Sequence, residues 1–186
     1  MARTRISLPA VEAGALGVVD RAGFEALTLS AVADRLGVGP SALYTHVEGL
    51  DGLRHLVAVA ATTNLTEAVR TAAIGTAGNT ALDSMGAAYR TFAQTHPGQF
   101  ASTLLPPVSS DDDLAAANRE LLDVFVLVYG AMGLDAEASH LAARSTRSAI
   151  HGFLALEHVT GTTPGHDAEY HHLLATLRRG IEASAS

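Results

Sequence analysis

The stretch that most constrains this chain runs from Thr28 to Leu56 and reads TLSAVADRLGVGPSALYTHVEGLDGLRHL. Thr28 stands where an N-cap hydroxyl is expected, and the apolar residues after it recur at the spacing of one helical face. Gly37 predicts the end of this helix, because glycine enters the left-handed conformation at little steric cost. After the turn at Pro40, a second short helix is predicted over residues 41–47. Two helices joined in this way form a helix-turn-helix unit, whose second helix can lie in the major groove of DNA.

The second predicted helix has a narrow apolar side and a wider polar one. Leu43 and Val47 form the inward stripe, which leaves the remaining side chains for another surface. Ser41, Ala42 and Thr45 are short groups suited to hydroxyl contacts with base edges and to a thymine methyl group. On geometry alone, an ordinary helical hairpin within a bundle is an equal alternative to a DNA-reading unit.

The amino-acid sequence of residues 27–47, LTLSAVADRLGVGPSALYTHV, favours the DNA-reading unit. It resembles the DNA-binding segment of the TetR (tetracycline repressor) family of bacterial transcription regulators. The matching features are a helix start at Thr28, the pair Val32-Ala33, the triplet Leu36-Gly37-Val38, and Leu43-Tyr44 followed by His46. The resemblance implies an all-α fold, with a three-helix DNA-binding domain and then a helical ligand-binding and dimerisation domain. It also implies that Tyr44 and His46 contact the DNA backbone, whereas the alternative for Tyr44 is a core aromatic residue.

The predicted DNA contacts combine this segment with nearby arginines. Two arginines of the N-terminal arm can reach phosphates or a minor groove when DNA is present. The candidate DNA-binding residues are Arg3, Arg5, Thr28, Pro40, Ser41, Ala42, Tyr44, Thr45, His46 and Arg54. Many members of the resembling family carry a phosphate-binding lysine where this chain has Leu50. Residues 1–57 hold five arginines against six acidic residues, so we expect a modest phosphate contribution and a weak dependence of binding on salt.

Composition excludes several classes of protein. The chain has 186 residues, of which 48% are hydrophobic, and this is enough for one large or two small domains with a real core. It has no cysteine, so disulfides, thiolate metal sites and a cysteine nucleophile are excluded. A formal net charge of −7 argues against a protein that binds nucleic acid nonspecifically through its overall charge, but allows a sequence-specific DNA-binding protein with a small basic face. We see no targeting or membrane-spanning segment, and we expect a soluble, cytoplasmic protein.

The rest of the chain is predicted to be helical. A connecting helix runs from Asp51 towards Arg70, and a loop is expected at residues 72–79. The next helix ends at Pro97-Gly98, and a short helix and a loop precede a helix over 114–132 with Asp113 as N-cap. The two last helices follow Asp135 and the turn at 161–165. No segment is a convincing strand, and no internal repeat is visible.

The middle helices carry the candidate residues of a small-molecule site. They combine apolar surface with a few polar groups, as such sites do. The candidates are Tyr89, Phe92, His96, Phe100, Phe125, Tyr129 and His151. The stretches AYRTFAQTHPGQF and RSAIHGFLALE resemble the ligand domain with a Trp-His-Gly signature found in part of the TetR family, although this chain lacks the tryptophan. The resemblance implies an inducer-binding domain without identifying the inducer, while core packing is the alternative for each aromatic residue taken alone.

The last two helices are predicted to form a homodimer. The first of them carries a stripe of mostly small residues that would let another helix come close: Ala138, Leu141, Ala142, Ser145, Ala149, Gly152 and Leu156. Pairing across a two-fold axis would give a four-helix bundle, although the stripes could instead fill the core of one subunit. We therefore expect a DNA-binding domain over residues 1–50 and an effector-binding and dimerisation domain over 51–186. The expected protein is a repressor that binds a palindromic double-stranded operator and is released by a small-molecule effector.

Other classes of function fit this sequence less well. The loop at residues 37–42 matches a dinucleotide-binding fingerprint only loosely, and a helix precedes it where a strand is required. The run HDAEYHH at 166–172 lacks an obvious third metal ligand, and no G-x-S-x-G nucleophile motif is present. We expect no enzyme activity, cofactor or metal. The main alternative is a helical dimeric ligand-binding or scaffold protein without specific DNA binding, which the acidic balance of residues 1–57 favours.

Overall fold

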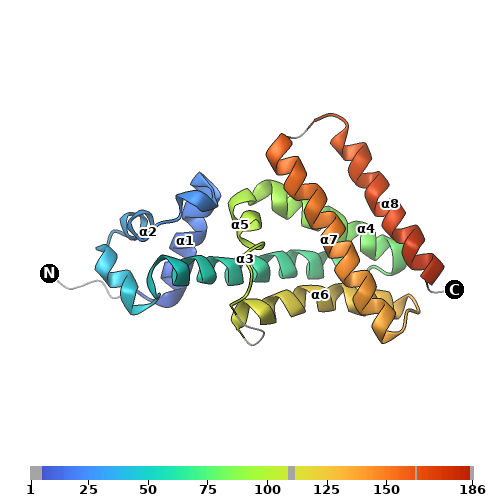
Figure 1. Ribbon diagram of the computed structural model, residues 1–186, viewed down its shortest axis with the longest axis horizontal. Coiled ribbons are helices and arrows are strands. Elements are labelled where there is room, and N and C mark those ends of the chain that lie inside the picture. Colours follow the sequence, from blue (N-terminus) through green and yellow to red (C-terminus); the bar gives the residue numbers. More distant parts are fainter. Residues whose placement is uncertain (1–5, 109–111, 162, 185–186) are drawn as a thin grey trace. The chain divides into compact units, whose positions relative to one another are not determined.

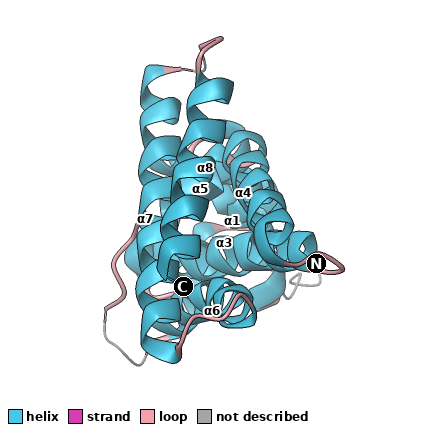
Figure 2. Ribbon diagram, turned by 90° about the vertical axis from the view of Figure 1, so that its right-hand side faces the viewer, coloured by secondary structure: helices cyan, strands magenta, loops and turns pink. Residues whose placement is uncertain are grey.

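The computed structural model describes residues 6–108, 112–161 and 163–184, and within these ranges it is helical with no strand (Figures 1 and 2). The all-α prediction is therefore confirmed. In chain order the helices are α1 (Leu8–Ala22), η1 (Phe24–Ala26), α2 (Leu29–Leu36), η2 (Pro40–Thr45), α3 (Gly49–Ala73), α4 (Gly78–Thr95), α5 (Pro97–Ser102), α6 (Asp113–Ala131), α7 (Ala136–Thr160) and α8 (His166–Ser184), where η denotes a 3₁₀ helix.

The chain forms two compact units. The first contains Met1–Asn64 and His96–Ala116, and the second contains Leu65–Thr95 and Ala117–Ser186. Helix α3 begins in the first unit and ends in the second. The first unit therefore includes α5 as well as the N-terminal helices, and α5 packs against α1 within it.

The core of the first unit is built from the inward faces of its helices. Its fully buried side chains come from α1, α2, η2, α3 and the residue that follows η1, and they include Val11, Ala15, Val19, Leu27, Val32, Leu43, Leu53 and Val57. Glycine permits one close approach in this unit, because a Cβ added at Gly98 of α5 would lie 2.0 Å from the carbonyl oxygen of Val19 at the end of α1. The two backbones therefore touch at a position that only glycine can occupy.

The start and end of α2 agree with the sequence prediction. The Thr28 hydroxyl accepts a hydrogen bond from the backbone N–H of Ala31 at 3.0 Å. Gly37 takes the left-handed conformation, with φ 67° and ψ 32°, and ends the helix. The second helix of the unit differs from the prediction, since residues 40–45 form a 3₁₀ helix and not an α-helix over 41–47. Its six residues are too few for two α-helical turns before the backbone changes direction at His46.

Several later boundaries also differ from the prediction. Helix α3 continues to Ala73 and α4 starts at Gly78, so the loop between them is shorter than residues 72–79. The N-cap of α6 is Asp112 and not Asp113, because the Asp112 carboxylate accepts a hydrogen bond from the N–H of Ala115 at 2.7 Å. At α7 the prediction holds, since Asp135 accepts from the N–H of Ala138 at 2.8 Å.

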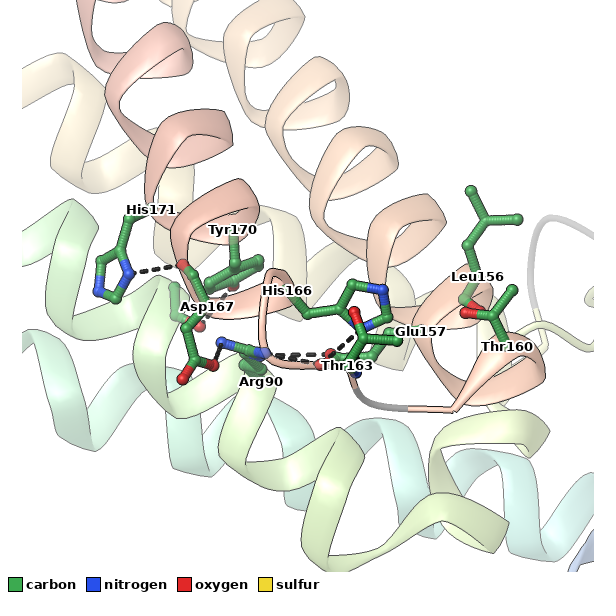
Figure 3. Close-up of polar contacts among 10 residues, drawn as sticks. Arg90, Leu156, Glu157, Thr160, Thr163, His166, Asp167, Tyr170 and His171 are labelled. Carbon is green, nitrogen blue, oxygen red and sulfur yellow. Dashed lines mark hydrogen bonds and ion pairs between the residues drawn. The ribbon is translucent and has the colours of Figure 1, made fainter.

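In the second unit, α7 and α8 run side by side in opposite directions, and both pack against α4 (Figures 1 and 2). A polar cluster joins the three helices where α7 ends and α8 begins (Figure 3). Arg90 of α4 binds Glu157 of α7 through Nη2 at 2.6 Å and Nε at 3.2 Å, and binds Asp167 of α8 at 2.8 Å. The Tyr170 hydroxyl donates to the carbonyl oxygen of Gly86 at 2.7 Å. We call Arg90, Glu157 and Asp167 the Arg90 cluster.

Candidate functional site

The reading segment, residues 40–46, has one buried face and one exposed face. Leu43 is fully buried in the core of the first unit and Val47 is nearly so. Tyr44, by contrast, is 61% exposed. The alternative that Tyr44 is a core residue is therefore wrong. Because the neighbouring Leu43 is anchored in the core, the exposed Tyr44 side chain is held where a partner outside the subunit can contact it.

The other candidate DNA-binding residues of this segment and of the preceding helix differ in their exposure to solvent. Thr28, Pro40, Ser41 and Thr45 are exposed, whereas Ala42 and His46 are half-buried. The Thr45 hydroxyl donates to the carbonyl oxygen of Ala42 at 2.8 Å, and the Thr28 hydroxyl is used in capping α2. Both hydroxyls keep acceptor capacity for an external donor. Arg3 and Arg5 lie outside the described residues.

Arg54 lies one turn into α3 and is half-buried. Its guanidinium carbon sits 6.0 Å from the centre of the Phe24 ring, which is within the range of a cation–π contact. Its Nε is buried without a hydrogen-bond partner among the described residues. The contact with the Phe24 ring thus holds this side chain near the start of α3.

The seven candidate ligand-binding residues fall into both units. His96 and Phe100 belong to the first, where His96 Nδ1 lies 3.1 Å from the Asp20 carboxylate. The same carboxylate accepts from the Gln99 amide at 2.9 Å, and Gln99 accepts from Asn64 at 3.0 Å. This network ties α1, α3 and α5 together, so within the first unit His96 has a packing role that the sequence prediction did not include.

The other five candidates, Tyr89, Phe92, Phe125, Tyr129 and His151, are buried in the second unit. Tyr89 of α4 and His151 of α7 hydrogen-bond through OH and Nδ1 at 3.1 Å, and their rings meet edge to face. Tyr129 of α6 hydrogen-bonds Thr146 of α7 at 2.7 Å. The structure therefore joins α4, α6 and α7 through buried polar pairs set among aromatic rings.

Burial controls the protonation of this group. It raises the pKa of Tyr89 to about 12 and that of Tyr129 to about 12. Burial, and secondarily the positive charge of Arg147, lowers the pKa of His151 to about 4. All three side chains are consequently neutral at physiological pH, and they offer hydrogen bonds without charge.

Sequence reasoning missed Arg147 and Asn118. Arg147 donates to the Asn118 side-chain oxygen at 2.5 Å, which links α7 to α6. Arg147 precedes His151 by four residues, and residues four apart lie on the same face of a helix. That spacing was a signal that could have found Arg147, whereas nothing in the sequence marked Asn118.

Groups of three or more histidine, aspartate or glutamate side chains that could hold a metal ion are absent from the described part of the chain. None of the helices in those ranges has the length and hydropathy needed to cross a membrane.

Known proteins are similar to this chain in sequence or in fold. A family model described as "Tetracyclin repressor-like, C-terminal domain" matches residues 82–177. An uncharacterised HTH-type transcriptional regulator of Mycobacterium tuberculosis, Rv0681, is 33% identical over 181 residues, covering 96% of this chain and 83% of the relative. YobS of Bacillus subtilis, another uncharacterised HTH-type transcriptional regulator, is 28% identical over 139 residues, covering 75% of this chain and 72% of the relative. The crystal structure of TetR-Q116A from Acinetobacter baumannii in complex with minocycline has a TM-score of 0.76 at 21% identity, covering 97% of this chain and 99% of that one. The chain belongs to the TetR family of helix-turn-helix, DNA-binding transcriptional regulators.

Proposed function

We propose that this regulator is a repressor that binds a palindromic operator as a homodimer and leaves it when a small-molecule effector binds. In this proposal residues 1–50 read the operator in the cytoplasm, and residues 51–186 bind the effector and dimerise. The observation that carries the DNA-binding role is the exposure of Tyr44 beside fully buried Leu43. The core thereby fixes the reading segment while its polar face points outward, as base and phosphate contacts require.

Helix α7 supports the dimer. The seven residues of its predicted stripe are all exposed or half-buried, so they do not fill the core of a single subunit. Leu141 and Leu156 are 61% and 67% exposed, and nothing lies within 4 Å of a Cβ added at Gly152 between them. The corresponding residues of α8 differ, because Tyr170, Leu174 and Ile181 are buried. An apolar, small-residue helix face of this kind fits a second copy of the same face across a two-fold axis.

A groove of about 380 Å³ between α7 and α8 extends this face and is lined by Leu141, Ser145, Leu177 and Gly180 among others. Two subunits joined there would present two reading segments to one DNA molecule. Segments spaced by about one DNA turn, roughly 34 Å, prefer an inverted repeat. The effector would act by favouring one spacing, and only a difference in its affinity for the two states can drive this change.

Tyr44→Ala tests the DNA-binding role. We expect affinity for DNA from around the protein's own gene to fall by about tenfold or more, because a hydrogen bond and an aromatic contact at the phosphate backbone are lost. The measurement is a binding titration with random competitor DNA at two salt concentrations. Leu127→Ala is the matched control, since Leu127 is 74% exposed on α6 in the second unit and should not change affinity.

Two outcomes of this titration would contradict the proposal. Equal competition by random DNA would mean that no operator is recognised, and the helical ligand-binding or scaffold function would replace it. If the Tyr44→Ala variant bound an inverted repeat as tightly as the unmodified protein, the protein would still be a regulator, but residues 40–46 would not form its DNA interface. A measured lack of mutual effect between ligand and operator affinities would exclude the effector mechanism.

Gly152→Arg tests the dimer. The monomer has open space at this position, so we expect the fold to persist while the molar mass in solution falls to that of one subunit. Light scattering after size exclusion measures the mass, and circular dichroism checks the fold. Gly130→Arg on α6, also open in the monomer, is the control and should leave the dimer intact. A Gly152→Arg protein that remains fully dimeric would place the interface elsewhere.

A further inference from the structure

Helix α7 has an apolar groove beside one end and two exposed apolar side chains at the other. The groove, of about 380 Å³, lies between the N-terminal half of α7 and the C-terminal half of α8 in the second unit. Its walls include Ala138, Leu141, Ala142 and Ser145 of α7 and Leu177 and Ile181 of α8. Near the C-terminal end of α7, Leu156 and Val159 are 67% and 82% exposed. One subunit thus carries both an apolar hollow and apolar side chains that it leaves in water.

The groove and the exposed pair share one face of α7. Ser145, Gly152 and Val159 follow one another at intervals of seven residues, and Leu156 comes four residues after Gly152. Intervals of three, four and seven keep side chains on the same side of an α-helix. A partner that covers this face therefore contacts the groove and the exposed pair together.

The order of large and small side chains along this face is the same in both directions. Leu141 lies seven residues before Ser148, and Leu156 lies seven residues after Ala149. The residues of the face between the two leucines are small: Ala142, Ser145, Ser148, Ala149 and Gly152. A Cβ added at Gly152 meets nothing within 4 Å, so the centre of the face is open to a close neighbour. A face with this order can pair with a copy of itself about a two-fold axis.

The antiparallel orientation is the one that brings the groove and the exposed leucine together. With the axis between Ser148 and Ala149, the partner subunit's Leu156 lies beside Leu141, at the groove, and the same contact recurs on the other side of the axis. A parallel pair would instead place Leu156 against the partner subunit's Leu156, leave both grooves open, and align the two helix dipoles unfavourably. Antiparallel pairing therefore removes the most apolar surface from water, and this burial is the driving force.

We propose that α7 pairs antiparallel with α7 of a second copy of this chain, about a two-fold axis between Ser148 and Ala149. The partner subunit's Leu156 enters the groove between α7 and α8, and the partner subunit's Val159 packs against Ala138. This specifies the contact that forms the proposed homodimer and therefore rests on the proposed function. It also assigns Leu156 as a residue on which the affinity between subunits depends.

Disulfide formation between introduced cysteines tests this register, because the chain has no cysteine of its own. Ser148→Cys places two thiols beside the axis, separated along the helices by only about 1.5 Å, the rise of one residue. We expect most of the oxidised full-length protein to run as a covalent dimer on a non-reducing gel. Leu156→Cys alone should run as a monomer, because its two thiols lie about 22 Å apart along the antiparallel helices, too far for a disulfide.

The double variant Leu141→Cys, Leu156→Cys should form the covalent dimer again, since each cysteine then meets the other kind in the partner. The two cysteines of one chain are also about 22 Å apart along α7, so they cannot link within a subunit. Leu127→Cys is the matched control for random collision, because Leu127 is 74% exposed on α6, and it should stay monomeric on the gel. Linking of Leu156→Cys alone as fast as Ser148→Cys would indicate a parallel pair. That result, or no link in Ser148→Cys, would overturn the proposal.

The dissociation constant of the dimer gives a second test that needs no oxidation. Leu156→Ala should raise it by at least about tenfold, because the shortened side chain no longer fills the groove. Sedimentation over a series of protein concentrations measures the constant, and circular dichroism checks the fold, which should persist because Leu156 is exposed in one subunit. Leu127→Ala is the control and should leave the constant unchanged. An unchanged constant in Leu156→Ala would also overturn the proposal.

Failure here is distinguishable from failure of the proposed function. Light scattering under reducing conditions gives the mass of the unmodified protein, whereas the disulfides report which residues meet. A protein that is dimeric by mass but links in another register would keep the homodimer and remove this contact. A protein that is monomeric at every concentration would remove the homodimer together with the contact.

Discussion

Replacing Arg90 with methionine is expected to lower the free energy of unfolding by about 3–5 kcal/mol, the usual cost of removing one partner from a buried ion pair. The side chains of Arg90 and Glu157 are only 11% and 5% exposed, and two hydrogen bonds join them. Methionine fills a similar volume but removes both guanidinium hydrogen bonds from the buried Glu157 carboxylate, which keeps only the more distant ring of His166, with Nδ1 at 3.7 Å, as an ion-pair partner within the described ranges. The loss therefore comes chiefly from the carboxylate that remains.

The position of the Arg90 cluster adds to the effect. Arg90 of α4 contacts both α7, through Glu157, and α8, through Asp167, and its guanidinium carbon lies 5.0 Å from the centre of the Tyr170 ring (Figure 3). Asp167 is 77% exposed, so its pairing with Arg90 is screened by solvent and contributes little. Glu157 is thus the partner on which the stability of this helix junction depends.

Urea unfolding at a fixed protein concentration measures the change. Arg178→Met is the matched control, because Arg178 pairs with Asp83 between α4 and α8 while both side chains are substantially exposed, 31% and 47%. We expect that control to cost less than about 1 kcal/mol. A loss of the same small size in Arg90→Met would show that the pair with Glu157 behaves as a surface ion pair.

A double variant separates the effect of the buried charge from that of packing. The double variant Arg90→Met, Glu157→Leu should regain most of the loss at pH 7, because an apolar pair of similar volume replaces the ion pair. A double variant as unstable as Arg90→Met would assign the effect to packing.

The N-terminal helices of the first unit could be predicted from sequence because local signals there agree with the tertiary structure, whereas nothing local indicated that α5 belongs to the same unit. Thr28 caps α2 and Gly37 ends it, and the hydrophobic residues 32, 33 and 43 occupy the core as their spacing indicated. The 3₁₀ form of residues 40–45 could not be predicted in the same way. A run of six residues that begins with a proline is compatible with either helical form, and in the structure this run packs against α2.

The candidate ligand site was predictable only in part. Aromatic residues at helical spacing indicated buried positions, and five of the seven do share the second unit. His96 and Phe100 follow Phe92 closely in sequence but belong to the first unit, because the helix breaks at Pro97. The pairing of Arg147 with Asn118 joins residues 29 positions apart, and such a contact depends on how α6 meets α7 rather than on any local pattern.

The sequence alone did not decide whether the small-residue face of α7 packs within one subunit or forms a dimer interface. A stripe of small residues such as Ser145 and Gly152 permits close packing, but it does not say whether the neighbour is in the same subunit. The structure leaves that stripe open on α7 while it buries the apolar side of α8. Periodicity identifies an apolar face, and only the tertiary arrangement decides what remains for a partner.

Gly98→Ala is expected to destabilise the first unit by about 3 kcal/mol or more, at the upper end of the usual cost of overpacking. The new methyl group would lie 2.0 Å from the carbonyl oxygen of Val19 and 2.6 Å from its carbonyl carbon. Both are backbone atoms at the end of α1, so no side-chain rotation can relieve the clash. Helix α5 must instead move away from α1, which also strains the hydrogen bond from Gln99 to Asp20.

Gly17→Ala is the control that isolates this cause. A Cβ at Gly17 would lie 2.4 Å from the Arg35 guanidinium, which is almost as close, but the end of an arginine side chain can move aside. We expect Gly17→Ala to be neutral or to stabilise the protein by up to about 1 kcal/mol, since alanine favours a helix over glycine. Thermal unfolding of both variants decides between the explanations. If both lost stability equally, any added methyl group in this unit would be damaging; a loss confined to Gly98→Ala would assign it to the contact of the α1 and α5 backbones.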